Sequence, residues 1–382
     1  MKTIPYGRQN IDHKDLISVR NALFSELITT GKYVKILEEN LKEFLGCKFV
    51  ISCSSGTAAI HLALLSINLK KNDAVIIPAI NFVAAANISK LLGAKVYFSD
   101  IDLTTGQSSP QNILDGIKKN KLQRVKAIFS MHLGGTPNYL KEMYLLKRKL
   151  RCFLIEDACH ALGASYYDNK HSFKVGNARF SDISTFSFHP IKSITSGEGG
   201  AVSTNNKYIA GRIRLLRSHG ITKKKGLNYD VVDHSLNYRL SDINCALAIS
   251  QLKKINIFIK RRRDISRIYY KKIDNYKNVI QLLNKNSINF SACHLVIVLI
   301  DFNKLRINKN KFYDLLSKKN IFCQFHYIPQ YKFSAFYENL ILRNSEHYYQ
   351  SAISLPIYYS LTNKSVDLVI KYIKEIVSKF LK

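Results

Sequence analysis

Short runs of β-branched and other apolar residues alternate with segments of helical periodicity over the first two-thirds of the chain. Strands that are separated by helices favour a mostly parallel sheet with helices on both faces. In the helical segment 82–92 the pattern ends before Gly93, a typical residue to follow a helix. The alternation predicts an α/β fold with seven strands in its main sheet, at residues 48–52, 74–78, 95–99, 125–129, 152–156, 183–188 and 200–203.

The segments on either side of this block have a different character. Ahead of it, two sets of apolar residues recur at helical spacing, namely Leu16, Val19, Leu23, Phe24 and Leu27, and then Leu37, Leu41, Phe44 and Leu45. After it come a long helical stretch over about 240–270, a strand-like run at 295–301, and helices near 311–318 and 365–380. We therefore expect an N-terminal arm (1–12), a large domain (13–245) and a smaller α+β C-terminal domain (246–382).

The composition is that of a globular protein, with 46% hydrophobic residues spread along 382 positions. No apolar run reaches the ~18–20 residues that span a bilayer. The first ten residues lack the apolar core and cleavage site of a secretory signal. The seven cysteines have no CxxC spacing. We expect reduced thiols, no metal site and a cytoplasmic location.

A formal net charge of +31 raises the question of nucleic-acid binding. The basic residues are mostly lysines in short runs, and the one dense arginine block, Arg261 to Arg263, lies inside the long helical stretch. No zinc spacing, aromatic RNA-binding signature or recognition-helix motif accompanies them. We expect a solvated, lysine-rich surface that binds no nucleic acid and attracts an anionic small substrate.

The run 153–157 is apolar until it ends in Glu156 and Asp157. Ligands of parallel α/β sheets bind at the carboxyl ends of the strands. An aspartate at such a place can hold a protonated ring nitrogen, because a nearby opposite charge favours the charged form. Pyridoxal phosphate needs that protonation to act as an electron sink. Taken alone, Asp157 is equally well explained as a helix N-cap.

Lys192 follows a predicted strand and precedes a run of small residues that ends in Gly199 and Gly200. A lysine in such a place forms an imine with a carbonyl group if its surroundings keep the amine partly neutral. The glycines permit tight turns beside a bulky ligand. The alternative is an exposed loop lysine, which the lysine-rich composition favours. His189, three residues earlier, is as well explained by packing as by catalysis.

Ser54, Ser55, Gly56 and Thr57 come directly after a predicted strand and open an apolar helix. Free backbone N–H groups, hydroxyls and the helix dipole form an anion site at such a place, suited to a cofactor phosphate. An ordinary capped helix start explains this segment equally well by itself.

Together, these segments resemble the DegT/DnrJ/StrS family of sugar aminotransferases, which have the pyridoxal-phosphate-dependent fold type I. The resemblance runs nearly end to end and includes residues 81–87, 93–96, 216–220 and 237–242. Asn81 stands where threonine is frequent and Cys159 where alanine is frequent. Some members carry histidine in place of Lys192 and perform dehydration or deoxygenation. The lysine is present here, so the resemblance implies transamination.

The resemblance also implies how the large domain binds the cofactor. Lys192 would carry pyridoxal 5'-phosphate as an imine and move the proton between cofactor and substrate carbons. Asp157 would hold the ring nitrogen, His160 would lie near the phenolic oxygen, and Phe82 would stack on the ring.

The family's phosphate-binding positions fall on Gly56, Thr57 and Ser187. A further one, Asn237, would reach the phosphate from a neighbouring subunit. The resemblance therefore implies a homodimer with shared active sites.

A narrower resemblance, carried by residues 6–12, 27–32, 157–164, 325–329 and 354–356, is to the transaminases of pseudaminic acid biosynthesis. Those enzymes convert a UDP-linked 2-acetamido-2,6-dideoxy-4-ketohexose to its 4-amino form with L-glutamate as donor. By this resemblance, the residues around the sugar nucleotide are Tyr6, Glu26, Leu27, Ile28, Thr29, Phe325, His326, Tyr327 and Ile328.

Two alternatives stay open beside this function. One is the same chemistry on another UDP- or dTDP-linked 4-keto-6-deoxy sugar. The other, from a different class, is a catalytically silent family member that regulates by binding nucleic acid. The net charge motivates this last hypothesis, and the presence of both Lys192 and Asp157 speaks against it.

Overall fold

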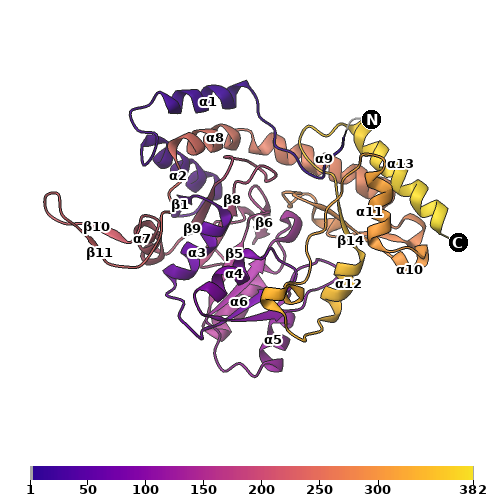
Figure 1. Cartoon of the computed structure of the whole chain (residues 1–382), viewed down its shortest axis with the longest axis horizontal. Coiled ribbons are helices and arrows are strands. Elements are labelled where there is room, and N and C mark those ends of the chain that lie inside the picture. Colours follow the sequence, from indigo (N-terminus) through magenta and orange to yellow (C-terminus); the bar gives the residue numbers. More distant parts are fainter. Residues whose placement is uncertain (1–2, 382) are drawn as a thin grey trace.

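A seven-stranded sheet forms the centre of the computed structural model, which describes residues 3–381 (Figure 1). Met1, Lys2 and Lys382, at the ends of the predicted arm and C-terminal domain, lie outside the described residues. The β8–β5, β5–β4, β4–β2 and β2–β3 pairs are parallel, whereas β9 is antiparallel to both of its neighbours. The order is β1 (Phe49–Cys53), β9 (Gly200–Thr204), β8 (Ile183–Ser187), β5 (Phe153–Asp157), β4 (Ala127–Met131), β2 (Ala74–Pro78) and β3 (Lys95–Ser99).

The predicted mostly parallel sheet is confirmed, and each strand lies within two residues of its predicted bounds. Successive residues of a strand point to opposite faces of the sheet. In β4, Ala127 and Phe129 belong to one core, and Ile128 belongs to another core on the opposite face. Helices therefore cover both faces.

The first face packs against α3 (Gly56–Ser66), α4 (Ala84–Leu91) and α7 (Lys207–Leu216). The other packs against α5 (Pro110–Lys119) and α6 (Leu140–Leu150) towards one end, and α2 (Lys32–Leu45) and α8 (Asp242–Leu252) towards the other. Just beyond α4, Gly93 has a φ of 79°, the left-handed conformation expected of a residue that follows a helix.

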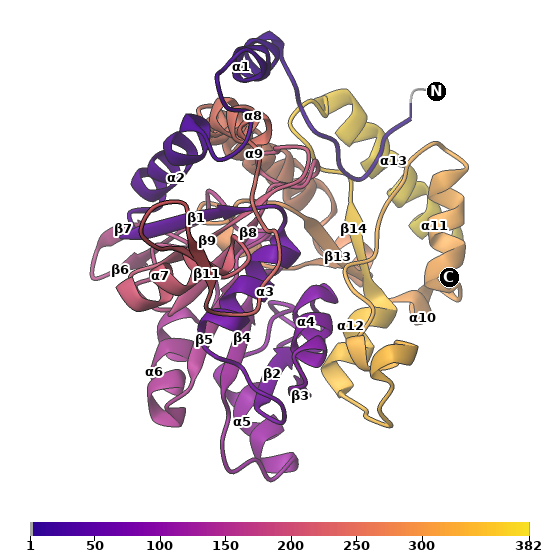
Figure 2. The same ribbon diagram turned by 60° about the vertical axis from the view of Figure 1, so that its left-hand side comes forward.

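A second core lies in the C-terminal part of the chain, which gathers on one side of the sheet in Figure 2 (orange and yellow). Its antiparallel sheet contains β12 (Ile280–Leu282), β13 (Val296–Ile300) and β14 (Ala352–Leu355). Helices α9 (Ile255–Ile273), α11 (Lys309–Ser317) and α13 (Asn363–Phe380) pack against it. Shorter elements complete the chain: α10 (Phe302–Leu305), α12 (Arg343–Ser351), and the hairpins of β6 (Ser165–Asp168) with β7 (His171–Lys174) and β10 (Ile221–Lys223) with β11 (Tyr229–Val231).

The prediction of one continuous helical stretch over about 240–270 is wrong. Two helices, α8 and α9, occupy this region, and Lys253 and Lys254 separate them. The Lys254 ammonium lies 2.9 Å from a carboxylate oxygen of Asp12 and 2.7 Å from one of Asp15. The break therefore coincides with ion pairs to the start of α1 (His13–Leu23), a contact that local periodicity does not encode.

Helix α1 packs along α8 on the outside of the molecule (Figure 1). Several apolar residues of its periodic pattern face solvent, since Leu16 is 60% exposed, Leu23 53% and Phe24 87%. All seven cysteines are unpaired. Among residues 3–381, no helix has the length and hydropathy needed to cross a bilayer.

Candidate active site

A cavity of about 550 Å³ lies at the carboxyl ends of the parallel strands. Met131, Asp157 and Ser187 are the last residues of β4, β5 and β8, and all three line it. Because β9 is antiparallel, its first residue lies at the same end of the sheet, and Glu198 just before it also lines the cavity. The strand ends that commonly bind ligands in α/β proteins thus converge here.

Lys192 reaches this cavity from the loop between β8 and β9. The Phe188 N–H donates to the Gly199 carbonyl at 2.8 Å, which closes the loop at its base. Burial lowers the pKa of Lys192, and the charge of Arg262 lowers it further, against the opposing effect of Cys159 and Asp157. The amine loses its proton more readily than an exposed lysine, as a nucleophilic lysine requires.

Asp157 presents a carboxylate to the cavity and is only 3% exposed. Its Oδ1 accepts a hydrogen bond from the backbone N–H of Cys159 at 3.2 Å. A buried carboxylate is costly unless it is paired. This one is therefore suited to a cationic group of a ligand, such as a protonated ring nitrogen.

The first turn of α3 forms another wall. The Ser55 hydroxyl caps the helix by accepting from the N–H of Ala58 at 3.0 Å, and Thr57 and Ser187 also line the cavity. A Cβ on Gly56 would approach the Cβ of Ser187 to 2.8 Å, so a larger residue does not fit there. Helix N–H groups and hydroxyls close together favour a bound phosphate.

Aromatic side chains also line the cavity. The Phe82 ring is half exposed and lies 6.0 Å from the ring of Tyr327. The Tyr327 hydroxyl is 3.1 Å from Nε2 of His160. Burial holds the pKa of His160 well below its usual value and lowers that of His326 to about 3. Both imidazoles are therefore neutral, and each can accept a hydrogen bond at one ring nitrogen.

Tyr6 completes the lining from the beginning of the chain. The arm is held by backbone hydrogen bonds from Ile4 N–H to the Asn320 carbonyl and from Phe322 N–H to the Ile4 carbonyl, both at 2.9 Å. The Ile357 N–H then donates to the carbonyl of Tyr6 itself, also at 2.9 Å. Segments from both ends of the chain thus enclose the cavity.

The structure brings most of the sequence-predicted site residues into this cavity. They are Tyr6, Gly56, Thr57, Phe82, Asp157, His160, Ser187, Lys192, Phe325, His326 and Tyr327, together with His189. Sequence reasoning missed Gln324 and Glu198 as lining residues, although both adjoin motifs it had singled out, and it missed Ile60, Met131 and Ile191, which carry no chemical signal.

Asn237, Ile328 and residues 26–29 do not line the cavity. Asn237 is exposed, and its side-chain oxygen accepts from the N–H of Arg239 at 3.1 Å. Thr29 forms a β-bridge with Ser241, and the Ile28 carbonyl accepts from the N–H of Asp242 at 2.9 Å. Residues 26–29 and Asn237 therefore both lie near the start of α8.

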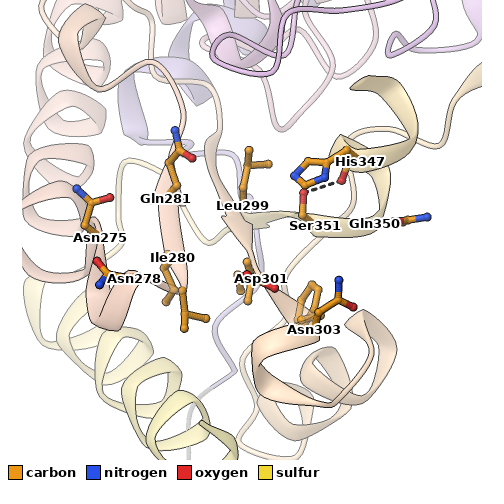
Figure 3. A pocket seen from close by; sticks show the side chains of 13 residues that line it. Asn275, Asn278, Ile280, Gln281, Leu299, Asp301, Asn303, His347, Gln350 and Ser351 are labelled. Atoms are coloured by element: carbon orange, nitrogen blue, oxygen red, sulfur yellow. Dashed lines mark hydrogen bonds between the residues drawn. The ribbon is translucent and has the colours of Figure 1, made fainter. Parts of the chain in front are cut away.

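A second cavity, of about 390 Å³, lies on the C-terminal sheet beside β12 and α12 (Figure 3). Its polar lining is mostly amide side chains, those of Asn275, Asn278, Gln281, Asn303 and Gln350. Among the residues that the structure describes, no lysine or arginine lines it, and so none there offers an amine to form an imine or a permanent cation to bind a phosphate. The reactive groups belong to the first cavity.

Comparison with known proteins agrees with this geometry. Residues 9–374 match the DegT/DnrJ/EryC1/StrS aminotransferase family. A Campylobacter jejuni protein named UDP-4-amino-4,6-dideoxy-N-acetyl-beta-L-altrosamine transaminase is 36% identical over 372 residues, covering 96% of this chain and 95% of that protein.

The structure of Helicobacter pylori PseC, an aminotransferase involved in the biosynthesis of pseudoaminic acid, superposes with a TM-score of 0.91 at 30% identity, covering 99% of this chain and 100% of that one. A putative sugar aminotransferase from Streptococcus pneumoniae, solved in its PMP form, has the same fold, with a TM-score of 0.90 at 24% identity and coverage of 99% and 100%.

Proposed function

Because the chain belongs to the DegT/DnrJ/EryC1/StrS aminotransferase family, we propose that it transfers an amino group from L-glutamate to C4 of a UDP-linked 2-acetamido-2,6-dideoxy-4-keto-hexose. The observation that carries the proposal is that the Lys192 amine shares one cavity with the Asp157 carboxylate and the first turn of α3. The names of the Campylobacter jejuni and Helicobacter pylori relatives support the sugar class.

The residues of the cavity suit pyridoxal 5'-phosphate. When bound, this cofactor supplies an electron sink for the carbon that gains or loses the amino group. Asp157 would hold its ring nitrogen, and Phe82 and His160 would contact the ring and its phenolic oxygen. Gly56, Thr57 and Ser187 would bind its phosphate.

Lys192 would hold the cofactor covalently and act as the proton carrier. Once glutamate has displaced Nζ from the cofactor, this amine would move a proton from the α-carbon of glutamate to the cofactor; the amino group would stay on the cofactor, and 2-oxoglutarate would leave after addition of water. In the second half-reaction Nζ would carry a proton to C4 of the sugar as the amino group passes to that carbon and the ketone oxygen leaves as water. A lysine whose pKa is lowered by burial suits both tasks, because its amine loses and regains a proton more readily than that of an exposed lysine.

We also propose a homodimer with shared sites. Phe24, Leu27 and Ile28 are large apolar residues with exposed fractions of 87%, 53% and 48%, and they lie in or beside the segment 26–29. Exposed apolar patches commonly mark protein contacts. A second copy that covers this surface would bring Asn237 and residues 26–29 to the neighbour's cavity, whose lining in one chain lacks them.

Shared sites predict complementation between two inactive variants. A mixed dimer of a Lys192→Ala chain and an Asn237→Ala chain contains one site with both native residues. We expect equal mixing to restore about a quarter of the wild-type rate, since half of the dimers are mixed and each has one working site. The measurement is the rate of amination after subunit exchange.

Mixing Lys192→Ala with Asp157→Asn is the matched control, because both residues serve the same chain's cavity and no site is repaired. If exchange is demonstrated and the Lys192→Ala/Asn237→Ala mixture stays inactive, the sharing of Asn237 is contradicted.

The substrate is tested with a panel of 4-keto nucleotide sugars and glutamate, with the product read by mass. We expect the UDP-linked 2-acetamido-2,6-dideoxy-4-keto-hexose to have the highest kcat/KM. Tyr6→Ala should raise KM with little change in kcat, because it removes a contact made equally before and during reaction. Tyr337→Ala, an exposed tyrosine outside the cavity, should change neither value.

Ionic strength gives a second readout of the same binding. A diphosphate is attracted by a chain of net charge +31, and this attraction weakens as the Debye length falls to ~8 Å near 0.15 M salt. A tenfold preference for a dTDP-linked keto sugar would overturn the proposed substrate and leave the aminotransferase chemistry standing.

A further inference from the structure

Arg262, on α9, is a buried cation close to the reactive lysine. Arg262 is only 3% exposed, and burial lowers the pKa of its guanidinium to about 10. Among residues 3–381, no carboxylate forms an ion pair with it, and its hydrogen-bond acceptors are backbone carbonyls. A buried charge without a counter-charge costs stability, which suggests that the arginine serves a purpose other than packing.

The three acceptors come from three separate segments. Nη1 donates to the carbonyls of His294 at 3.3 Å and Ile357 at 3.2 Å, which lie just before β13 and just after β14. Nη2 donates to the carbonyl of Ile191 at 3.3 Å. One guanidinium thus connects the C-terminal sheet to the residue that precedes Lys192.

Lys192 and Arg262 also line the same small cavity. It has a volume of about 10 Å³, and Pro190, Ser193 and Thr195 of the lysine loop form part of its wall. Arg8 also lines it. Cations that share one narrow space repel each other more strongly than they would in water. The positive charge of Arg262 therefore disfavours the ammonium form of Lys192.

Other groups act on Lys192 as well. Burial has the largest effect on the pKa of Lys192 and lowers it, Cys159 and Asp157 raise it, and Arg262 has a smaller effect that adds to the effect of burial. Histidines near the cavity supply no compensating charge, since burial holds the pKa values of His160, His294 and His326 below the usual value. Among the charged side chains that act on Lys192, Arg262 is the cation whose charge opposes protonation of the lysine amine.

We propose that Arg262 is a positioning residue that anchors the Lys192 loop to the C-terminal sheet and whose unpaired positive charge disfavours a second positive charge on the lysine amine. The catalytic meaning of this arrangement rests on the proposed role of Lys192 as proton carrier. The electrostatic effect itself belongs to the protein without cofactor and can be measured there.

The test is competitive acylation of the cofactor-free protein with acetic anhydride between pH 6 and 11. Peptide mass spectrometry follows the acetylation of Lys192 and of exposed lysines in the same sample. We expect Arg262→Met and Arg262→Gln to move the midpoint for Lys192 upwards by about one pH unit, because a repelling charge is lost. Arg262→Lys retains the charge and should leave the midpoint near that of the unchanged protein.

Arg263→Met is the matched control. This neighbouring arginine donates to the carbonyl of Ser291 at 2.9 Å and is not among the charges that act on Lys192. It should leave the Lys192 midpoint unchanged, and circular dichroism identifies which variants are folded.

An upward shift in either folded charge-removing variant, without a shift in Arg263→Met, supports the proposal. Equal midpoints in Arg262→Gln, Arg262→Met and the unchanged protein would overturn it, as would an equal shift in Arg262→Lys. Since acylation requires neither cofactor nor substrate, the result is independent of whether the proposed transamination is found.

Discussion

Replacing Lys192 by alanine should slow transamination by on the order of 10⁴-fold or more, because a positioned proton carrier alone contributes up to that factor. Among residues 3–381, Lys192 is also the one lysine that lines the cavity, so no other described lysine is there to take its place. The rate is measured with glutamate and the preferred keto sugar. In the unchanged protein, borohydride treatment should fix pyridoxal phosphate to the peptide that contains Lys192.

Lys119→Ala is a suitable control, since this exposed lysine ends α5 and does not line the cavity. It should retain the full rate. Cofactor fixed to a different lysine, or a Lys192→Ala protein with the wild-type rate, would refute the assignment.

The second large effect is expected from Asp157→Asn. The amide keeps the size of the side chain and can still accept from the Cys159 N–H, but it removes the negative charge that would hold a protonated ring nitrogen. Loss of one preorganised electrostatic contact typically slows an enzyme ~10²–10³-fold. We expect a fall of that size in kcat with the cofactor still bound, as measured by absorbance and steady-state rates.

Glu156→Gln provides the comparison, because neighbouring residues of a strand point to opposite faces. The Glu156 carboxylate accepts from the Ser184 hydroxyl at 2.6 Å and does not line the cavity. Its kcat should stay close to that of the wild type. An Asp157→Asn rate within twofold of the wild-type rate would mean that another group holds the ring nitrogen.

Much of the central sheet could be predicted from sequence because each buried strand has its own local signal. The runs that became β2 and β3 were predicted with the bounds that the structure shows, and those of β4 were misplaced by two residues. The short strands of the β6–β7 and β10–β11 hairpins were not predicted. They contain three or four residues each, many of them partly or fully exposed, so no apolar pattern distinguishes them from loops.

Exposure could not be predicted from periodicity in the first helix. Leu16 and Leu37 belong to similar apolar patterns, yet Leu16 is 60% exposed and Leu37 is fully buried. Periodicity indicates that a helix has an apolar face but not whether that face is covered within the same chain.

What the sequence determined by itself was the order of the elements and the chemical types at the strand ends, with Asp157 closing one strand and Lys192 following another. These features depend on residues close together in the chain. Only the tertiary structure decided that Tyr6, Asp157 and Tyr327 share one cavity, and that Asn237 lies outside it. It alone brought Arg262 to the carbonyl of Ile191, 71 residues away. Contacts of this kind depend on how separate elements pack against each other. The local periodicity of one segment does not indicate which other segment it will contact.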